Sequence, residues 1–167
     1  MLVSEKWLLR ITQVLLLAAI AVVPFVRVNE LYFPFVSGKA YVFRVLVAVA
    51  FFFWIWLLVK NSKPLVPFRN VLVIALVLFF VAQLVAALFG VDPVYSLFSS
   101  IERADGVIQY GFWLLYFLMF LSVFREKRDW TLFFGTFVAV AVLLSGYSWM
   151  NHESQPQLYG IFGNPAY

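Results

Sequence analysis

The chain has 167 residues, of which 65% are hydrophobic, 20% aromatic and only 12% charged. An ordinary soluble domain carries about 25% charged residues and at this size buries only about 70% of the surface of its unfolded chain, so a soluble globular fold is excluded. The net charge of +4 is dispersed along the chain, which argues against a nucleic-acid partner, and the absence of cysteine excludes disulfides and thiolate metal sites.

Five apolar stretches are each long enough to cross a bilayer. A hydrocarbon core about 30 Å thick requires roughly 20 mostly apolar residues in a helix. The predicted spans, in chain order, are residues 8–26, 40–59, 71–89, 107–124 and 130–150. Pro24 predicts an end or a bend near the close of the first span. The sequence therefore predicts an all-α, polytopic transmembrane bundle that forms one domain over residues 1–167.

The first stretch has a second interpretation. Lys6 and Arg10, the apolar run after them and the sequence Ala19-Ile20-Ala21 also match a cleaved signal peptide. The second span would run from outside to inside under either interpretation.

The basic residues predict the orientation of the spans. Basic loops stay on the cytoplasmic side of a membrane. Eight of the twelve basic residues lie before or near the start of span one, between spans two and three, or between spans four and five. These segments are therefore predicted to be cytoplasmic, and residues 27–39, 90–106 and 151–167 to face outward. The cytoplasmic set is Lys6, Arg10, Lys60, Lys63, Arg69, Arg125, Lys127 and Arg128, and the outer set is Arg27, Lys39, Arg44 and Arg103.

Arg44 is the unusual residue of the second span. A charge at mid-depth of a membrane helix costs about 2.5–3.5 kcal/mol on insertion scales, and less near the interface. Three interpretations stay open. The side chain reaches outward to the lipid headgroups, it forms an internal ion pair, or it joins Lys39 in binding the phosphate of a lipid-linked substrate. A planar guanidinium matches phosphate oxygens, and a lysine adds a point charge.

The second outer loop contains two local signals. Asp92-Pro93 is a turn signal, and Ser99 with Glu102 fits a capping box, which predicts a short helix that starts near Ser100. Glu102, Arg103 and Asp105 then cluster before Gly106, where span four begins. This cluster fits either local capping with a surface ion pair or a direct role in binding.

Two glutamines lie inside predicted spans. Gln83 is in span three and Gln109 is just inside span four. Each is predicted to bond a neighbouring helix rather than a ligand.

The third outer segment ends in "GIFGNPAY", residues 160–167. Its glycines and the Asn164-Pro165 pair are typical of turns, and proline suits the first turn of a helix. A sixth span is therefore expected to begin here, which would make the chain the N-terminal part of a larger membrane protein. His152, the only histidine, lies beside Glu153 with no partner at metal-ligand spacing, and a solvated loop is the expected setting.

Three stretches together resemble one family. "FPFVSGKAYVFRVLV" (residues 33–47), "YSLFSSIERADGVIQYGFWLLYFL" (95–118) and "YGIFGNPAY" (159–167) are similar to the N-terminal part of bacterial O-antigen ligase/polymerase-type membrane proteins. The three stretches also occur in the expected order.

The resemblance implies an integral membrane glycosyltransferase of the bacterial inner (cytoplasmic) membrane that acts in cell-envelope glycan and lipopolysaccharide biosynthesis. Such a protein takes a glycan from an undecaprenyl-diphosphate carrier at the outer face and passes it to an acceptor. It needs no nucleotide sugar at that step and, as a rule, no metal or other cofactor. The catalytic loop of the family would lie beyond Tyr167, so no catalytic residue is assigned to this chain, and the family's catalytic histidine is not carried over to His152.

The resemblance also implies roles for nine residues. Lys39, Arg44 and Arg103 are the candidates for contact with the carrier phosphate. The other matched positions are motif or architectural residues: Glu102, Asp105, Gly106, Gly163, Asn164 and Pro165.

Two other functions stay open on the sequence. One is part of a polytopic transporter or flippase, although such proteins favour ionisable groups near the bilayer midplane and spans three to five contain no charge. The other is a small non-catalytic membrane protein that assembles with partners.

Overall fold

The computed structural model describes residues 3–31, 36–60, 70–100 and 104–150. Within these ranges every regular element is helical: α1 (Val3–Val22), the 3-10 turn η1 (Val23–Phe25), α2 (Ser37–Lys60), α3 (Val71–Leu88), α4 (Pro93–Phe98), α5 (Val107–Val123) and α6 (Lys127–Met150). Four of these helices, α1, α2, α3 and α6, are long and apolar enough to cross a membrane, and α5 is a shorter apolar helix. The predicted all-α membrane bundle is confirmed.

Each predicted span coincides with a helix, but several boundaries differ. α1 ends at Val22 because Pro24 lies in η1, as its position predicts. α2 begins at Ser37, three residues before the predicted position. α6 begins at Lys127 rather than Trp130. Its early start has a local cause, since the Asp129 carboxylate accepts the backbone N–H groups of the two residues before the helix, at 3.1 and 3.0 Å.

The predicted helix start near Ser100 involves Glu102 and residues 101–103, which lie outside the described ranges. The short helix α4 lies before Ser99, where the Asp92 carboxylate accepts the Tyr95 N–H at 2.9 Å and Pro93 occupies the first helical position. Aspartate is a preferred N-cap and proline a preferred first residue. Ser99 instead follows the last residue of α4 with φ of 59°, and its hydroxyl donates to the Asp105 carboxylate.

The core lies where α1, α2 and α5 meet. Its buried side chains are Leu8, Leu16, Val47, Ala50, Trp54, Leu57, Met119, Phe120, Val123 and Phe124. Two side-chain hydrogen bonds fasten α1 to α5. Gln13 Nε2 donates to the Val123 carbonyl at 2.8 Å, and the Tyr116 hydroxyl donates to the Leu16 carbonyl at 3.1 Å. Interhelical polar bonds of this kind hold helices together where lipid removes the hydrophobic driving force.

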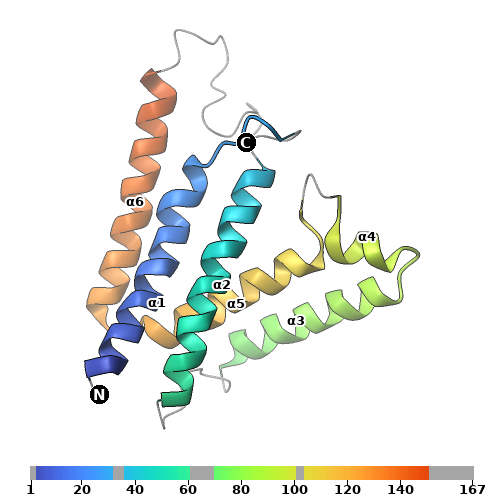
Figure 1. Cartoon of the computed structure of the whole chain (residues 1–167), viewed down its shortest axis with the longest axis horizontal. Coiled ribbons are helices and arrows are strands. Elements are labelled where there is room, and N and C mark those ends of the chain that lie inside the picture. Colours follow the sequence, from blue (N-terminus) through green and yellow to red (C-terminus); the bar gives the residue numbers. More distant parts are fainter. Residues whose placement is uncertain (1–2, 32–35, 61–69, 101–103, 151–167) are drawn as a thin grey trace.

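The remaining helices pack on this core unevenly. α6 contacts α1, and aromatic rings in its first turns pack edge-to-face against α5, with Phe133 and Trp130 at 4.6 and 5.4 Å from the Phe120 ring. α3 contacts α5 and α4. Figure 1 shows α1, α2 and α6 side by side, with α3 and α5 inclined to them and α4 at their far end.

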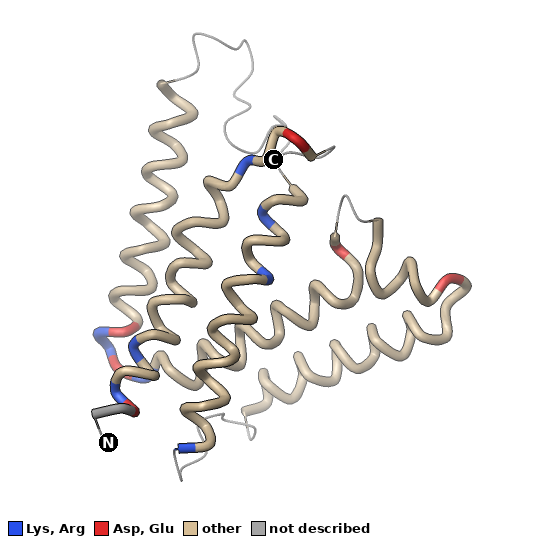
Figure 2. Tube along the Cα trace, in the orientation of Figure 1, with Lys and Arg blue, Asp and Glu red and all other residues tan. Residues whose placement is uncertain are grey.

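Most of the basic residues in the described ranges lie at one end of the bundle. The start of α1, the end of α2, the end of α5 and the start of α6 lie at one end (Figure 1), and Figure 2 shows basic residues gathered there. The predicted grouping of basic residues on one side is therefore confirmed for those in the described ranges. We call the opposite end, where α1 ends and α2 begins, the outer end, after the predicted orientation.

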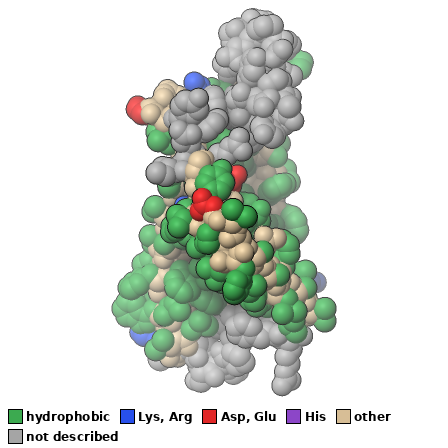
Figure 3. Space-filling model, turned by 90° about the vertical axis from the view of Figure 1, so that its right-hand side faces the viewer, with side chains coloured by type: hydrophobic (Ala, Val, Ile, Leu, Met, Phe, Trp, Pro, Cys, Tyr) green, Lys and Arg blue, Asp and Glu red, His purple; other side chains and the backbone are tan. Residues whose placement is uncertain are grey.

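Much of the helical surface is apolar and exposed. α3 buries only Val73 and Ala87, and α6 only Val140. Figure 3 views the side on which α3 and α4 lie, and hydrophobic side chains cover most of it. A helix that is apolar on nearly every side and faces outward requires lipid as its solvent.

Candidate functional site

Arg44 joins α2 to the start of α5. Its Nε donates to Gln109 Oε1 at 2.8 Å, and its Nη2 donates to the Ala104 carbonyl at 2.6 Å. The guanidinium carbon also lies 5.9 Å from the centre of the Tyr41 ring and 5.8 Å from that of Phe112, within the range of cation–π attraction. The side chain is therefore held from both helices.

Gln109 is a suitable partner at this depth. It is the third residue of α5 and only 5% exposed, so its amide oxygen needs a donor. Arg44 supplies that donor, and the Gln109 oxygen helps to offset the cost of placing a charge in the second span. The prediction that Gln109 bonds a neighbouring helix is confirmed. Gln83, by contrast, makes no side-chain hydrogen bond to any residue in the described ranges.

The segment between α4 and α5 has an unusual backbone. Ser99 and Ala104 both have positive φ, at 59° and 55°. Residues other than glycine and asparagine rarely adopt this backbone conformation. The Ala104 N–H donates to the Ser100 carbonyl at 2.9 Å, while the Ala104 carbonyl faces Arg44. Such strain persists only where the surroundings hold the backbone in place, and the Arg44 bond is one of those restraints.

Gly106 lets α4 fold back against the start of α5. A Cβ at this position would press on the backbone carbonyl of Leu97, far inside van der Waals contact. A backbone atom cannot swing aside as a flexible side chain can, so only glycine fits here. The close approach brings Asp105, next to Gly106, within reach of the Ser99 hydroxyl.

The hydrogen bonds of Arg44 support its three interpretations to different degrees. Its two hydrogen bonds run sideways to α5 and to the preceding loop rather than outward to the headgroups. Neither acceptor is a carboxylate, so an internal ion pair has no support among the described residues. Three of the five guanidinium N–H donors have no acceptor among the described residues, which leaves them available to an anion.

Lys39 does not share this arrangement. It is half-buried in the first turn of α2, and the offset of five positions from Lys39 to Arg44 corresponds to about 140° around the helix. Arg44 faces α5, so Lys39 lies on another side of α2. The remaining predicted residues lie outside the described ranges, namely Glu102, Arg103, Gly163, Asn164, Pro165 and also His152.

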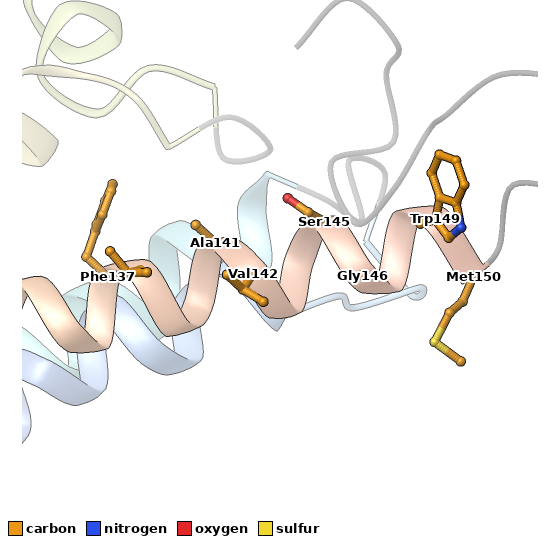
Figure 4. A pocket seen from close by; sticks show the side chains of 8 residues that line it. Phe137, Ala141, Val142, Ser145, Gly146, Trp149 and Met150 are labelled. Carbon is orange, nitrogen blue, oxygen red and sulfur yellow. The ribbon is translucent and has the colours of Figure 1, made fainter.

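The other feature of note is a shallow apolar hollow along α6. Eight residues between Phe137 and Met150 line it, and all of them belong to this one helix (Figure 4). Ser145 supplies the only side-chain hydroxyl among the eight. No group of three or more His, Cys, Asp or Glu residues that could hold a metal occurs in the described part of the chain. Arg44 is therefore the candidate site among the described residues.

Sequence reasoning missed two partners at this site. The Ala104 carbonyl is a backbone group, for which no residue type gives a signal. The Ser99–Asp105 bond was overlooked because Ser99 also fits a capping box with Glu102. The helix-capping strength of Asp92-Pro93 was the signal that could have placed Ser99 after a helix instead of before one.

The comparisons with known proteins leave the family open. No family model, no curated protein and no solved structure matches the chain. The helices establish a membrane protein, and the site described above is the basis on which its function is proposed.

Proposed function

We propose that the chain is the N-terminal part of an O-antigen ligase/polymerase-type glycosyltransferase. It would move a glycan from an undecaprenyl-diphosphate carrier to an acceptor at the outer face of the bacterial inner membrane. One observation carries the proposal beyond resemblance. Two of the three family-like stretches, 60 to 65 residues apart in sequence, are bonded to each other through Arg44. A shared site would require such a meeting.

The chemistry of Arg44 suits a diphosphate. Arginine offers paired donors that match phosphate oxygens, and the bonds to Gln109 and Ala104 hold the guanidinium in one orientation. An ordered donor loses less conformational entropy when it binds an anion. Lys39 and Arg103 are the other proposed contacts, and they would act from a different side of α2 and from the outer loop.

The proposed reaction defines which step these residues would assist. A bond forms between the acceptor oxygen and the anomeric carbon, while the bond from that carbon to the diphosphate oxygen breaks. The acceptor proton passes to a general base, and undecaprenyl diphosphate leaves. Arg44 would stabilise the negative charge that grows on the leaving diphosphate. The general base is not assigned to any residue of this chain.

The test is glycan transfer in membrane vesicles that contain the natural gene product. Vesicles receive an undecaprenyl-diphosphate-linked glycan and a lipid A-core acceptor, and the glycosylated acceptor is measured. We expect transfer by the wild type and a rise of about tenfold or more in the donor concentration that Arg44→Ala needs, equivalent to about 1.4 kcal/mol of binding. Arg27→Ala, at the same end of the bundle, is the control and should leave that concentration unchanged.

Two results would overturn the proposal. One is a wild-type protein, present in the vesicles at normal level, that transfers no glycan from the undecaprenyl-diphosphate donor to lipid A-core, to a growing glycan or to protein. The other is an Arg44→Ala variant with the same donor dependence as the wild type.

A further inference from the structure

The short helix α4 carries an apolar surface that no described residue covers. We define the α4 surface as Phe89, Val91, Val94, Tyr95 and Phe98, each of which exposes more than half of its side chain. Val94, Tyr95 and Phe98 lie on one face of α4, because residues four apart in a helix are neighbours. Ser96 and Leu97 lie on the other face and are half-buried toward the bundle. Large apolar residues gathered in this way mark an interaction surface.

Several polar groups of α4 are bonded within the segment. The Asp92 carboxylate accepts the Tyr95 N–H, and the Ser96 hydroxyl donates to the Asp92 carbonyl at 2.8 Å. The Ser96 and Ser99 N–H groups bond the Asp92 and Tyr95 carbonyls at 3.0 and 2.7 Å. Each of these bonds lowers the cost of taking the segment out of water.

Arg44 fixes the depth of this segment. It lies seven residues after Ser37, about 10 Å along the axis of α2, and it bonds the loop that leads from α4 to α5. The loop is therefore tied below the outer end of α2 rather than above it. Figure 1 agrees, since α4 lies at the outer ends of the inclined α3 and α5 and below the level of the outer ends of α1 and α2.

The α4 surface continues the lipid-facing surface of α3. Val81, Val85 and Leu88 are exposed along α3 up to the point where Phe89 begins the α4 surface, and Figure 3 shows hydrophobic side chains over this side of the molecule. Two exposed carboxylates, Asp92 and Asp105, lie at the ends of the α4 segment. An apolar face with polar groups beside it suits the boundary between acyl chains and headgroups.

We propose that α4 is an interfacial membrane anchor, whose surface inserts into the lipid of the outer leaflet at the boundary between acyl chains and headgroups. The hydrogen bond from Arg44 to the Ala104 carbonyl holds it at this depth. The anchor does not depend on the proposed glycosyltransferase activity, since it follows from exposure, depth and internal hydrogen bonding alone.

Site-directed spin labelling tests the anchor directly. The 167-residue chain has no cysteine, so a nitroxide on Val94→Cys reports one position in proteoliposomes of phosphatidylethanolamine and phosphatidylglycerol. We expect the label to collide with oxygen more than with a water-soluble nickel chelate, as a label on Val81→Cys in α3 should. Asn29→Cys, in the exposed turn after η1, is the water-facing control and should show the opposite preference.

Phe98→Cys repeats the measurement one turn further along the same face, so that a local disturbance at position 94 does not decide the result. The anchor is overturned if both labels prefer the nickel chelate, which would place α4 in water. It is equally overturned if both labels are shielded from oxygen and from the chelate, which would mean that another protein segment covers the surface.

Discussion

Arg44 shows how one charged side chain can be accommodated in an apolar helix without a counter-charge. Its acceptors are an amide oxygen and a backbone carbonyl, and two aromatic rings lie near its guanidinium. Neutral acceptors leave the positive charge uncancelled, so the site keeps its attraction for an anion. A carboxylate partner would have given a comparable bond and removed that attraction.

The bond between Arg44 and Gln109 should appear as an energetic coupling. We expect Arg44→Ala and Gln109→Ala to be non-additive by about 0.5–2 kcal/mol in unfolding free energy, because each variant removes the same interhelical bond. The measurement is a double-mutant cycle of unfolding in mixed micelles.

The matched control is the pair Arg44→Ala and Gln83→Ala. Gln83 is a glutamine of the same kind in α3, and it makes no side-chain hydrogen bond within the described ranges. This pair should be additive within about 0.5 kcal/mol. Additivity in both cycles would show that the Arg44–Gln109 bond contributes nothing to the fold.

At the scale of elements, the described residues between α4 and α5 combine several unusual backbone features. Positive φ at Ser99 and Ala104, the Ser99–Asp105 bond and the backbone contact at Gly106 all occur within eight residues. The turn sets where α5 begins, and therefore where Gln109 meets Arg44.

Gly106→Ala should break this turn. A methyl group would overlap the Leu97 carbonyl, and overpacking of this kind costs about 1–3 kcal/mol. Thermal unfolding in detergent micelles measures the loss. Gly135→Ala in α6 has open space around it and should be unchanged or stabilised by up to about 1 kcal/mol, because alanine favours a helix over glycine. Equal effects of the two variants would contradict the close approach at Gly106.

At the scale of the whole molecule, the helices form a small core and leave much of their apolar surface to lipid. α1, α2 and α5 share the buried side chains, while α3 and α6 bury very few. Orientation in the membrane then depends on the charges at the two ends, because basic segments resist translocation.

Cysteine labelling should reveal this orientation. In cells that express the cysteine-free chain, a membrane-impermeant maleimide should label Asn29→Cys from outside. It should label Lys60→Cys, at the end of α2, only after the membrane is permeabilised. The reverse pattern would invert the predicted topology, and labelling of both sites from outside would exclude a membrane span between them.

The membrane class, the five long apolar helices and the grouping of basic residues are all predictable from the sequence. These features depend on long apolar runs and on charge position, which are local properties of the chain. Pro24 and Asp92-Pro93 also act locally, and each marks a helix boundary in the structure. Ser99 lies directly after α4, whose start is marked by the aspartate–proline pair.

The contacts of Arg44 and the depth of α4 below the outer end are visible only in the packed structure. The Ala104 carbonyl has no signature in the sequence, and its meeting with Arg44 depends on the packing of α2 against α5 across 60 residues of chain. The exposure of the α4 surface likewise depends on which face of α4 packs on its neighbours. Contacts between distant segments follow from how whole helices pack, and a pattern read along one chain does not contain that arrangement.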